Sequence, residues 1–210
     1  MKILRVGATG LVGQLVLARL LESPGVARVV APTRRPLALR HPALENPVVD
    51  FDALPADAPW WAVDAAICTL GTTLAVAGSR DAFRRVDHDY PLAVARLARG
   101  QGARTFVLTS AMGADAHSSV FYNRVKGELE EAIAALDYPT LVVVRPGLID
   151  GERSERRPAE AAALVVSRAL RPLLPAKWRP SRAARIADAL AAAALAPPPG
   201  RSVVGSVQLA

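Results

Sequence analysis

The chain has 210 residues, and its 26 lysines and arginines exceed its 19 aspartates and glutamates, which gives a formal net charge of +7. This length favours a single domain over residues 1–210, and a hydrophobic content of 51% excludes wholesale disorder. The one cysteine, Cys68, excludes a disulfide framework and a cysteine-based metal cluster, and it favours a reducing, cytoplasmic compartment.

Six short apolar runs predict strands buried on both faces, because they are rich in leucine or β-branched residues and mostly lack polar alternation. They cover residues 3–6, 28–31, 48–49, 65–69, 105–109 and 141–145. Longer periodic segments predict helices over residues 11–22, 81–100 and 120–136, the second of them kinked or restarted at Pro91. The alternation predicts an α/β fold with a doubly wound, Rossmann-like parallel sheet.

The rhythm changes after residue 145. Two helices rich in alanine and arginine are expected over about 158–171 and 181–195, followed by a turn at 197–200 and an apolar stretch over 203–209. We expect region 147–195 to form a short helical part that borders a substrate pocket. No segment predicts a signal peptide or a membrane span, because the apolar runs are too short or carry charges.

The excess of basic charge lies in residues 151–210, where nine arginines and Lys177 face four acidic residues. The basic residues lack interleaved aromatic side chains, which argues against nucleic-acid binding. They could instead favour an acidic substrate or a protein partner, or form an ordinary solvated helix surface. The residues of this predicted basic rim are Arg153, Arg156, Arg157, Arg168, Arg171, Lys177, Arg179, Arg182 and Arg185.

A glycine-rich loop follows the first predicted strand and opens the first predicted helix. Gly7 allows a tight turn, Gly10 lets the backbone approach a pyrophosphate, and Gly13 lets the helix pack against the strand. The free N–H groups at the start of the helix favour an anion there. We therefore predict a dinucleotide site whose first loop consists of Gly7, Thr9, Gly10, Leu11, Val12 and Gly13.

The end of the second strand indicates which dinucleotide binds. An acidic residue there would favour NAD(H), whereas this chain has Thr33, Arg34 and Arg35. An arginine can accommodate the 2′-phosphate, so we predict NADP(H) over NAD(H), with a solvated arginine pair as the alternative. Asp50 and Phe51 could flank the adenine, and the loop of Leu70, Gly71 and Thr72 could approach the nicotinamide.

A tyrosine and a lysine stand four residues apart in the third predicted helix. Tyr122 and Lys126 lie on one helical face, and Ser110 ends the fifth strand. A lysine cation lowers the pKa of a nearby tyrosine, which makes the phenol a better acid–base catalyst near neutral pH. We predict that Ser110 binds a substrate oxygen, Tyr122 exchanges its proton, and Lys126 also holds a cofactor ribose. No metal site is expected, because the three histidines show no ligand spacing.

These motifs resemble the atypical or extended branch of the short-chain dehydrogenase/reductase superfamily. The runs 68–73, 83–90, 125–128 and 145–148 resemble, more narrowly, the family of the Tat-interacting NADPH-binding oxidoreductase-like proteins. The resemblance implies NADP(H), a serine–tyrosine–lysine constellation and cofactor contacts from Pro146, Gly147 and Leu148. It also implies that Asp87 stands where many of these enzymes have an asparagine that relays protons.

The combined pattern predicts an NADP(H)-dependent oxidoreductase that transfers a hydride to or from a small carbonyl or alcohol. One alternative is an NADP(H)-binding regulatory protein that reports its cofactor to a protein partner, since only a short segment follows Pro146. Another is an NAD-dependent sugar-nucleotide epimerase, which Arg34 and Arg35 disfavour. The sequence leaves the oligomeric state open.

Overall fold

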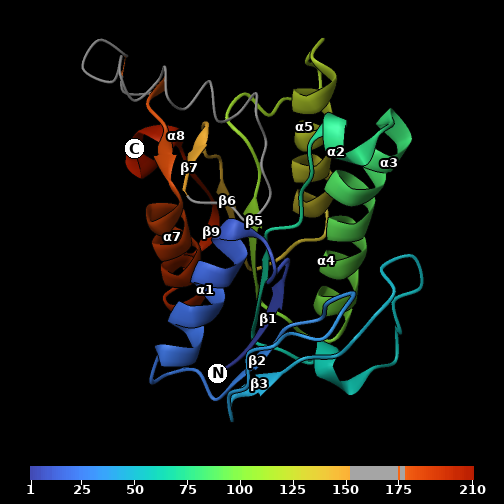
Figure 1. Cartoon of the computed structure of the whole chain (residues 1–210), viewed down its shortest axis with the longest axis vertical. Helices are drawn as coiled ribbons and strands as arrows, with labels where there is room; N and C mark the ends of the chain where they lie inside the picture. Colours follow the sequence, from blue (N-terminus) through green and yellow to red (C-terminus); the bar gives the residue numbers. More distant parts are fainter. Residues whose placement is uncertain (152–174, 176–177) are drawn as a thin grey trace.

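The computed structural model describes residues 1–151, 175 and 178–210. A parallel sheet of seven strands forms its centre, in the order β3-β2-β1-β4-β5-β6-β9. This arrangement confirms the predicted doubly wound sheet (Figure 1). The strands are β1 (Lys2–Val6), β2 (Arg28–Val30), β3 (Leu44–Glu45), β4 (Ala65–Cys68), β5 (Thr105–Thr109), β6 (Thr140–Val144) and β9 (Gly200–Val204).

Helices cover both faces of the sheet (Figure 1). Helices α1 (Leu11–Glu22) and α7 (Ala183–Leu195) pack on one face, and α4 (Tyr90–Gly100) and α5 (Phe121–Ala134) pack on the other. The shorter elements are η1 (Pro59–Trp61), α2 (Leu74–Ala77), α3 (Arg80–Arg84), the π-helical turn η2 (Arg85–Asp89), α8 (Ser206–Leu209) and the paired strands β7 (Ile149–Asp150) and β8 (Ser181–Arg182).

Strand β5 shows why the central strands are apolar throughout. Phe106 and Leu108 belong to the core under α4 and α5, and Val107 belongs to the core under α1 and α7. Successive side chains of a strand point to opposite faces, so a strand covered on both sides needs apolar residues at every position. Ser110 continues the alternation toward the α5 side just beyond the strand.

The third strand lies earlier than predicted. Strand β3 is Leu44–Glu45, and of the predicted pair only Val48 makes an isolated bridge, with Thr33. Pro47 has no N–H group, so it cannot continue the ladder toward the carbonyl of Ala31. The side-chain amide of Asn46 donates a hydrogen bond from Nδ2 to that carbonyl instead, at 2.5 Å. A proline thus ends the strand although β-branched residues follow it.

The helix predicted over residues 81–100 is interrupted. Its first part is α3, its last part is α4, and η2 joins them with a π-helical turn directly before Pro91. The predicted restart near Pro91 is confirmed, because a proline cannot donate the hydrogen bond that would continue an α-helix. The turn directs the Asp87 side chain into the protein, where it is 1% exposed.

The C-terminal part adds the last strand of the sheet. The helix predicted over 181–195 is found as α7, and the one predicted over 158–171 lies outside the described residues. The apolar stretch over 203–209 divides at Gly205 into the end of β9 and the short helix α8. Across the portion of the chain that the structure describes, no helix is long and apolar enough to cross a membrane.

Candidate functional site

Most of the predicted site residues lie beyond the carboxyl ends of the neighbouring strands β1, β4, β5 and β6 and at the start of α5, and the others follow β2 and β3. In Figure 1 this edge of the sheet faces the top of the view, where α1 and α5 begin. The glycine loop follows β1, residues 70–72 follow β4, Ser110 follows β5, and residues 146–148 follow β6. Parallel strands bring their carboxyl ends to one edge, which is where ligands of open α/β sheets bind.

The three loop glycines have three different surroundings. Gly7 has φ +86°, and a Cβ on it would lie 2.8 Å from the backbone carbon of Thr69. A Cβ on Gly13 would lie only 2.0 Å from the carbonyl oxygen of Gly7, so close packing requires glycine there. Around Gly10 the nearest atom to such a Cβ is 3.7 Å away. The loop is therefore closed on its inner side and open at Gly10, which fits a phosphate group approaching the backbone.

The other loop residues support this shape. Thr9 is exposed, Leu11 is partly buried, and Val12 is buried in the core under α1. Gly10 is the N-cap residue of α1 and has no side chain to bind the free N–H groups of the first turn. These N–H groups remain available to an anion.

Lys126 forms a buried ion pair with Asp87. Its Nζ lies 2.7 Å from Oδ1 of Asp87, and the other carboxylate oxygen accepts a hydrogen bond from the N–H of Thr72 at 2.7 Å. Gly71 lies above the pair, since a Cβ on it would be 3.3 Å from Oδ1 and 3.7 Å from Nζ. The structure thus brings Lys126 to the loop after β4 and gives Asp87 a direct partner.

The ion pair decides the charge of Lys126. Burial is the largest influence and lowers the pKa of its ammonium, but Asp87, Tyr122 and Cys68 together raise it by more, so that the net pKa lies above its ordinary value. Tyr122 also raises the pKa of Lys126 electrostatically, which shows that these two side chains interact. Tyr122 is 39% exposed and packs its ring 5.6 Å from that of Phe83. The tyrosine therefore stands at the surface above a buried, protonated lysine.

Ser110 takes part in a second buried network. Its hydroxyl donates to Oε1 of Glu130 at 2.5 Å, and Arg145 donates to both oxygens of the same carboxylate at 2.9 and 2.6 Å. Glu130 is 1% exposed, and its hydrogen bonds raise the pKa of Arg145 above its ordinary value. The hydroxyl proton of Ser110 is directed at Glu130, so a role of Ser110 on a substrate oxygen stays a prediction.

Sequence reasoning missed Glu130, although a signal was present. Tyr122, Lys126 and Glu130 are spaced by four residues and so lie on one face of α5. Their exposure falls from Tyr122 to Lys126 and Glu130. The acidic run Glu128 to Glu131 looks solvated in the sequence, which hides the one carboxylate that points inward.

At the end of β2, Thr33 is buried and its hydroxyl donates to the carbonyl of Arg35 at 2.7 Å. Arg34 and Arg35 are exposed, and in the described part of the chain neither forms an ion pair. Their guanidinium groups can therefore meet an anion in solvent. Phe51 differs from expectation, because its side chain is 8% exposed and packs 5.6 Å from the ring of Tyr90. Only its backbone and the exposed Asp50 can reach a ligand.

Beyond β6, Pro146 is buried, and Gly147 and Leu148 are partly buried. The N–H of Gly147 donates to Oγ of Ser181 at 3.0 Å, and the carbonyl of Leu148 accepts from the N–H of Ser181. These hydrogen bonds connect the segment to β8, and they do not connect it to the glycine loop. Of the predicted basic rim, only Arg179, Arg182 and Arg185 are described, and the six others lie outside the described residues.

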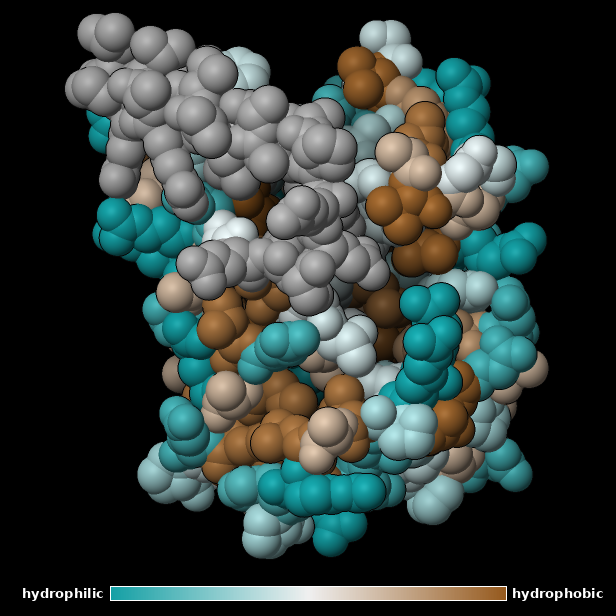
Figure 2. Space-filling model, in the orientation of Figure 1, coloured by the Kyte–Doolittle hydropathy of each residue, from teal (hydrophilic) through white to brown (hydrophobic). Residues whose placement is uncertain are grey.

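An apolar surface flanks the site. Leu74 and Val76 of α2 and Val120 and Tyr122 at the start of α5 are large apolar side chains that remain exposed. Figure 2 shows hydrophobic side chains gathered over α2 and the upper part of α5. A substrate that enters past Tyr122 would meet this apolar rim.

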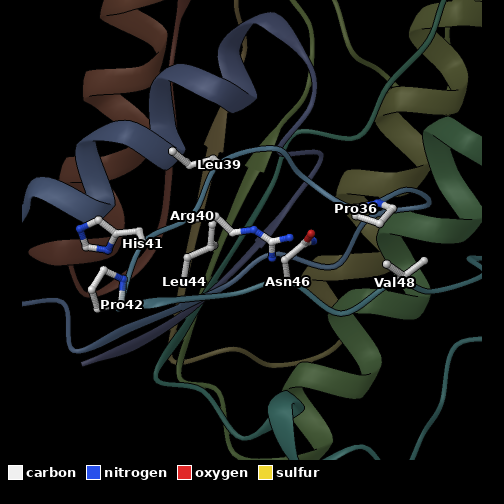
Figure 3. Close-up of a pocket in the computed structure, with 8 residues that line it drawn as sticks. All are labelled: Pro36, Leu39, Arg40, His41, Pro42, Leu44, Asn46 and Val48. Carbon is white, nitrogen blue, oxygen red and sulfur yellow. The ribbon is translucent and has the colours of Figure 1, made fainter.

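Two hollows are lined by residues other than those of this apolar surface. One, of about 600 Å³, lies beside β3 between the loop after Arg35 and Val48 (Figure 3). Its walls include Leu39, Arg40 and His41, and it contains none of the predicted site residues. The second, of about 160 Å³, is lined by the Glu130–Arg145 pair together with Asp115 and Arg201.

Taken together, the parallel sheet and the glycine loop define a Rossmann-like α/β protein. Two solved structures show the same fold: MoeE5 in complex with UDP-glucose and NAD, with a TM-score of 0.75, and an oxidoreductase of the short chain dehydrogenase/reductase family from Burkholderia thailandensis, with a TM-score of 0.68. The first is 16% identical and matched over 98% of this chain and 76% of that chain; the second is 21% identical, over 99% and 92%.

Closer relatives identify the family. The protein fmp52, mitochondrial, of Emericella nidulans is 38% identical over 174 residues, which are 79% of this chain and 74% of that protein. The rat protein HTATIP2 is 40% identical over 158 residues, 73% of this chain and 65% of that protein. The chain therefore belongs to the family of fmp52, and it is also similar to HTATIP2.

This membership confirms the predicted resemblance. No family model matches the chain. Several of the fmp52 relatives are named as mitochondrial proteins, so the comparisons give no support to the expected cytoplasmic compartment.

Proposed function

We propose that this protein is an NADP(H)-dependent oxidoreductase that acts on a small carbonyl or alcohol. The observation that carries the proposal is the position of the Lys126–Asp87 pair, directly beneath Gly71 and beside Tyr122. Tyr122 stands at the carboxyl edge of a Rossmann sheet, and the buried ammonium of Lys126 beneath it favours the ionised form of the phenol.

The cofactor is held by the chain's own loops. The glycine loop, open at Gly10, receives the pyrophosphate, and Arg34 and Arg35 meet the 2′-phosphate. Leu70 to Thr72 and Pro146 to Leu148 border the nicotinamide half, and Lys126 reaches the ribose beside it. When bound, NADP(H) supplies or accepts the hydride.

Tyr122 exchanges the proton with the substrate oxygen. Lys126 stabilises the tyrosinate, and Asp87 keeps the lysine protonated in spite of its burial. The apolar rim at α2 and α5 favours substrates with an apolar body next to the reacting carbonyl. Ser110 is assigned to the buried network with Glu130, since its proton is already donated there.

The test is oxidation of NADPH with a panel of apolar and acidic aldehydes and ketones. Wild-type protein should bind NADPH and turn over at least one apolar carbonyl, whereas Tyr122→Phe should lose at least about 100-fold in turnover and keep its affinity for NADPH. Unchanged turnover in Tyr122→Phe would reject the assigned role of the tyrosine. Absence of NADPH binding would reject the proposal altogether.

A second candidate is an NADP(H)-binding regulatory protein with little catalysis. The Ser110–Glu130 hydrogen bond favours it, because the site then lacks a serine donor for a substrate oxygen. Asp87 also offsets the charge that Lys126 presents to Tyr122. Tight binding of NADPH without turnover of any carbonyl in the panel is the result expected for this candidate.

A further inference from the structure

Strand β1 carries a completely buried arginine. Arg5 is 0% exposed and lies two residues before Gly7. Within residues 1–151, 175 and 178–210, no carboxylate forms an ion pair with it. Burial lowers the pKa of Arg5 to about 10, so the guanidinium still carries its charge at neutral pH. A buried charge without a counter-charge is costly, and its presence calls for a physical reason.

The partners of this guanidinium are all oxygens at the base of the glycine loop. Nη1 donates to the carbonyl of Val6 and, at 3.4 Å, to that of Ile67. Nη2 donates to Oγ1 of Thr69 at 2.6 Å and to the carbonyl of Gly7 at 3.4 Å. The guanidinium therefore joins the carboxyl ends of β1 and β4 from below the loop.

The guanidinium also fills the space between the loop and α1. A Cβ on Gly13 would lie 2.8 Å from Nη2 of Arg5. Nε of Arg5 is buried and has no hydrogen-bond acceptor among the described residues, which do not fully satisfy the cation. Its charge stands beneath the glycine loop, next to the start of α1, whose first turn has no side-chain cap.

We propose that Arg5 is a positioning residue of the dinucleotide site. Its positive charge is balanced by the pyrophosphate of the cofactor, which binds on the other side of the glycine loop. By binding the carbonyls of Val6 and Gly7, Arg5 keeps those negative dipoles turned inward and leaves the N–H groups facing outward. The inference rests on the proposed binding of NADP(H).

Two consequences separate this role from simple packing. Arg5→Met removes an unbalanced buried charge, so the protein without cofactor should be no less stable than wild type, or slightly more stable. The same variant should bind NADPH about tenfold more weakly, and its affinity should depend less on salt. Arg5→Lys keeps the charge without the planar fork and should recover most of the affinity.

The experiment measures the dissociation constant for NADPH by fluorescence titration at low and high salt, together with thermal unfolding with and without NADPH. Arg104→Met is the matched control, because it removes an exposed positive charge at the amino end of β5, on the opposite edge of the sheet. Inorganic pyrophosphate serves as a competitor in each titration. The control should bind like wild type.

Equal affinity of Arg5→Met and wild type at every salt concentration would overturn the inference. A folded Arg5→Lys that binds as weakly as Arg5→Met would overturn the attraction between the Arg5 charge and the pyrophosphate, because the hydrogen bonds of the planar fork alone would then account for the loss. If Arg5→Met does not fold, the affinity of Arg5→Lys for NADPH is compared with that of wild type at low and high salt, and this comparison tests the inference instead. If wild type itself does not bind NADPH or NADH, the proposed function fails, a result distinct from either of these.

Discussion

Nζ of Lys126 lies 2.7 Å from Oδ1 of Asp87, and both side chains are almost entirely excluded from solvent. The π-helical turn before Pro91 brings the carboxylate to this position. A lysine that the sequence suggests as a free cation beside Tyr122 is instead half of a buried pair. Its consequences for charge and stability can be measured.

Asp87→Asn should destabilise the protein by about 3 kcal/mol, because removing one partner of a buried pair leaves the other charge uncompensated. The pKa of Lys126 should fall below its ordinary value in the variant, since burial, the largest influence, is then opposed only by the weaker effects of Tyr122 and Cys68. Urea unfolding measures the loss. Glu128→Gln is the control, because its pairs with arginines are partly exposed and should contribute less than about 1 kcal/mol.

The pH dependence of this loss has a definite sign. In wild type the raised pKa of Lys126 contributes stability that is present at neutral pH and is lost as pH rises through the folded pKa, above the ordinary value of 10.5. In Asp87→Asn the ammonium of Lys126 is buried without its carboxylate partner, and deprotonation of Lys126 removes this cost to the stability of the folded state. The difference in unfolding free energy should therefore be largest near neutral pH and shrink as the pH rises, first through the lowered pKa of the variant, below 10.5, and then through the raised pKa of wild type. A difference that grows with pH would contradict the assigned pair.

Gly10→Ala and Gly13→Ala should have opposite effects on folding and binding. A methyl on Gly13 would meet the carbonyl of Gly7 at 2.0 Å, so that variant should lose about 3 kcal/mol of stability. Gly10 has φ −76° and open space around it, so Gly10→Ala should fold normally but weaken NADPH binding by about tenfold or more. Thermal unfolding and cofactor titration separate the two. Gly25→Ala, also in open space, should change neither quantity.

Replacing both Arg34 and Arg35 by alanine should change the choice of cofactor. We expect the dissociation constant for NADPH to rise by about 10- to 100-fold while that for NADH stays within about twofold, because only NADPH carries the 2′-phosphate. Parallel titrations with the two cofactors measure the ratio. Equal affinities in wild type, unaffected by the double substitution, would show that the arginines are merely solvated.

Ser110→Ala should act on stability more than on turnover. The variant removes a hydrogen bond to buried Glu130, which costs about 1–2 kcal/mol, while Arg145 still holds the carboxylate. Turnover should fall by less than about tenfold, compared with at least about 100-fold for Tyr122→Phe. Ser119→Ala, at an exposed position, is the control for stability. A large loss of turnover at unchanged stability would contradict this assignment and support the predicted role of Ser110 in binding a substrate oxygen.

The positions of most strands and the glycine loop could be predicted because their signals are local. A strand followed by Gly7, Gly10 and Gly13 has few other meanings, and runs such as residues 105–109 are apolar at every position because both faces are covered. The third strand lies earlier than the β-branched pair at 48–49 suggests, because Pro47 interrupts the ladder, Asn46 replaces its missing donor, and Val48 adds only an isolated bridge.

The buried polar network could not be predicted in the same way. Whether Glu130 points inward depends on Arg145 and Ser110, which are distant in sequence and meet it only in the folded sheet. Arg5 presents the same difficulty, since an arginine in a strand normally indicates an exposed position. Both depend on long-range contacts that residue spacing alone does not encode.

The pairing of β9 with β6 has a consequence for how the protein is made. Residues 140–144 pair in parallel with residues 200–204, so β6, with its run of leucine and valine, stays an open edge until the later strand has been synthesised. Such an edge can pair with another chain, and parallel strands distant in sequence associate slowly. During translation the molecule therefore passes through a stage in which aggregation competes with completion of its own sheet.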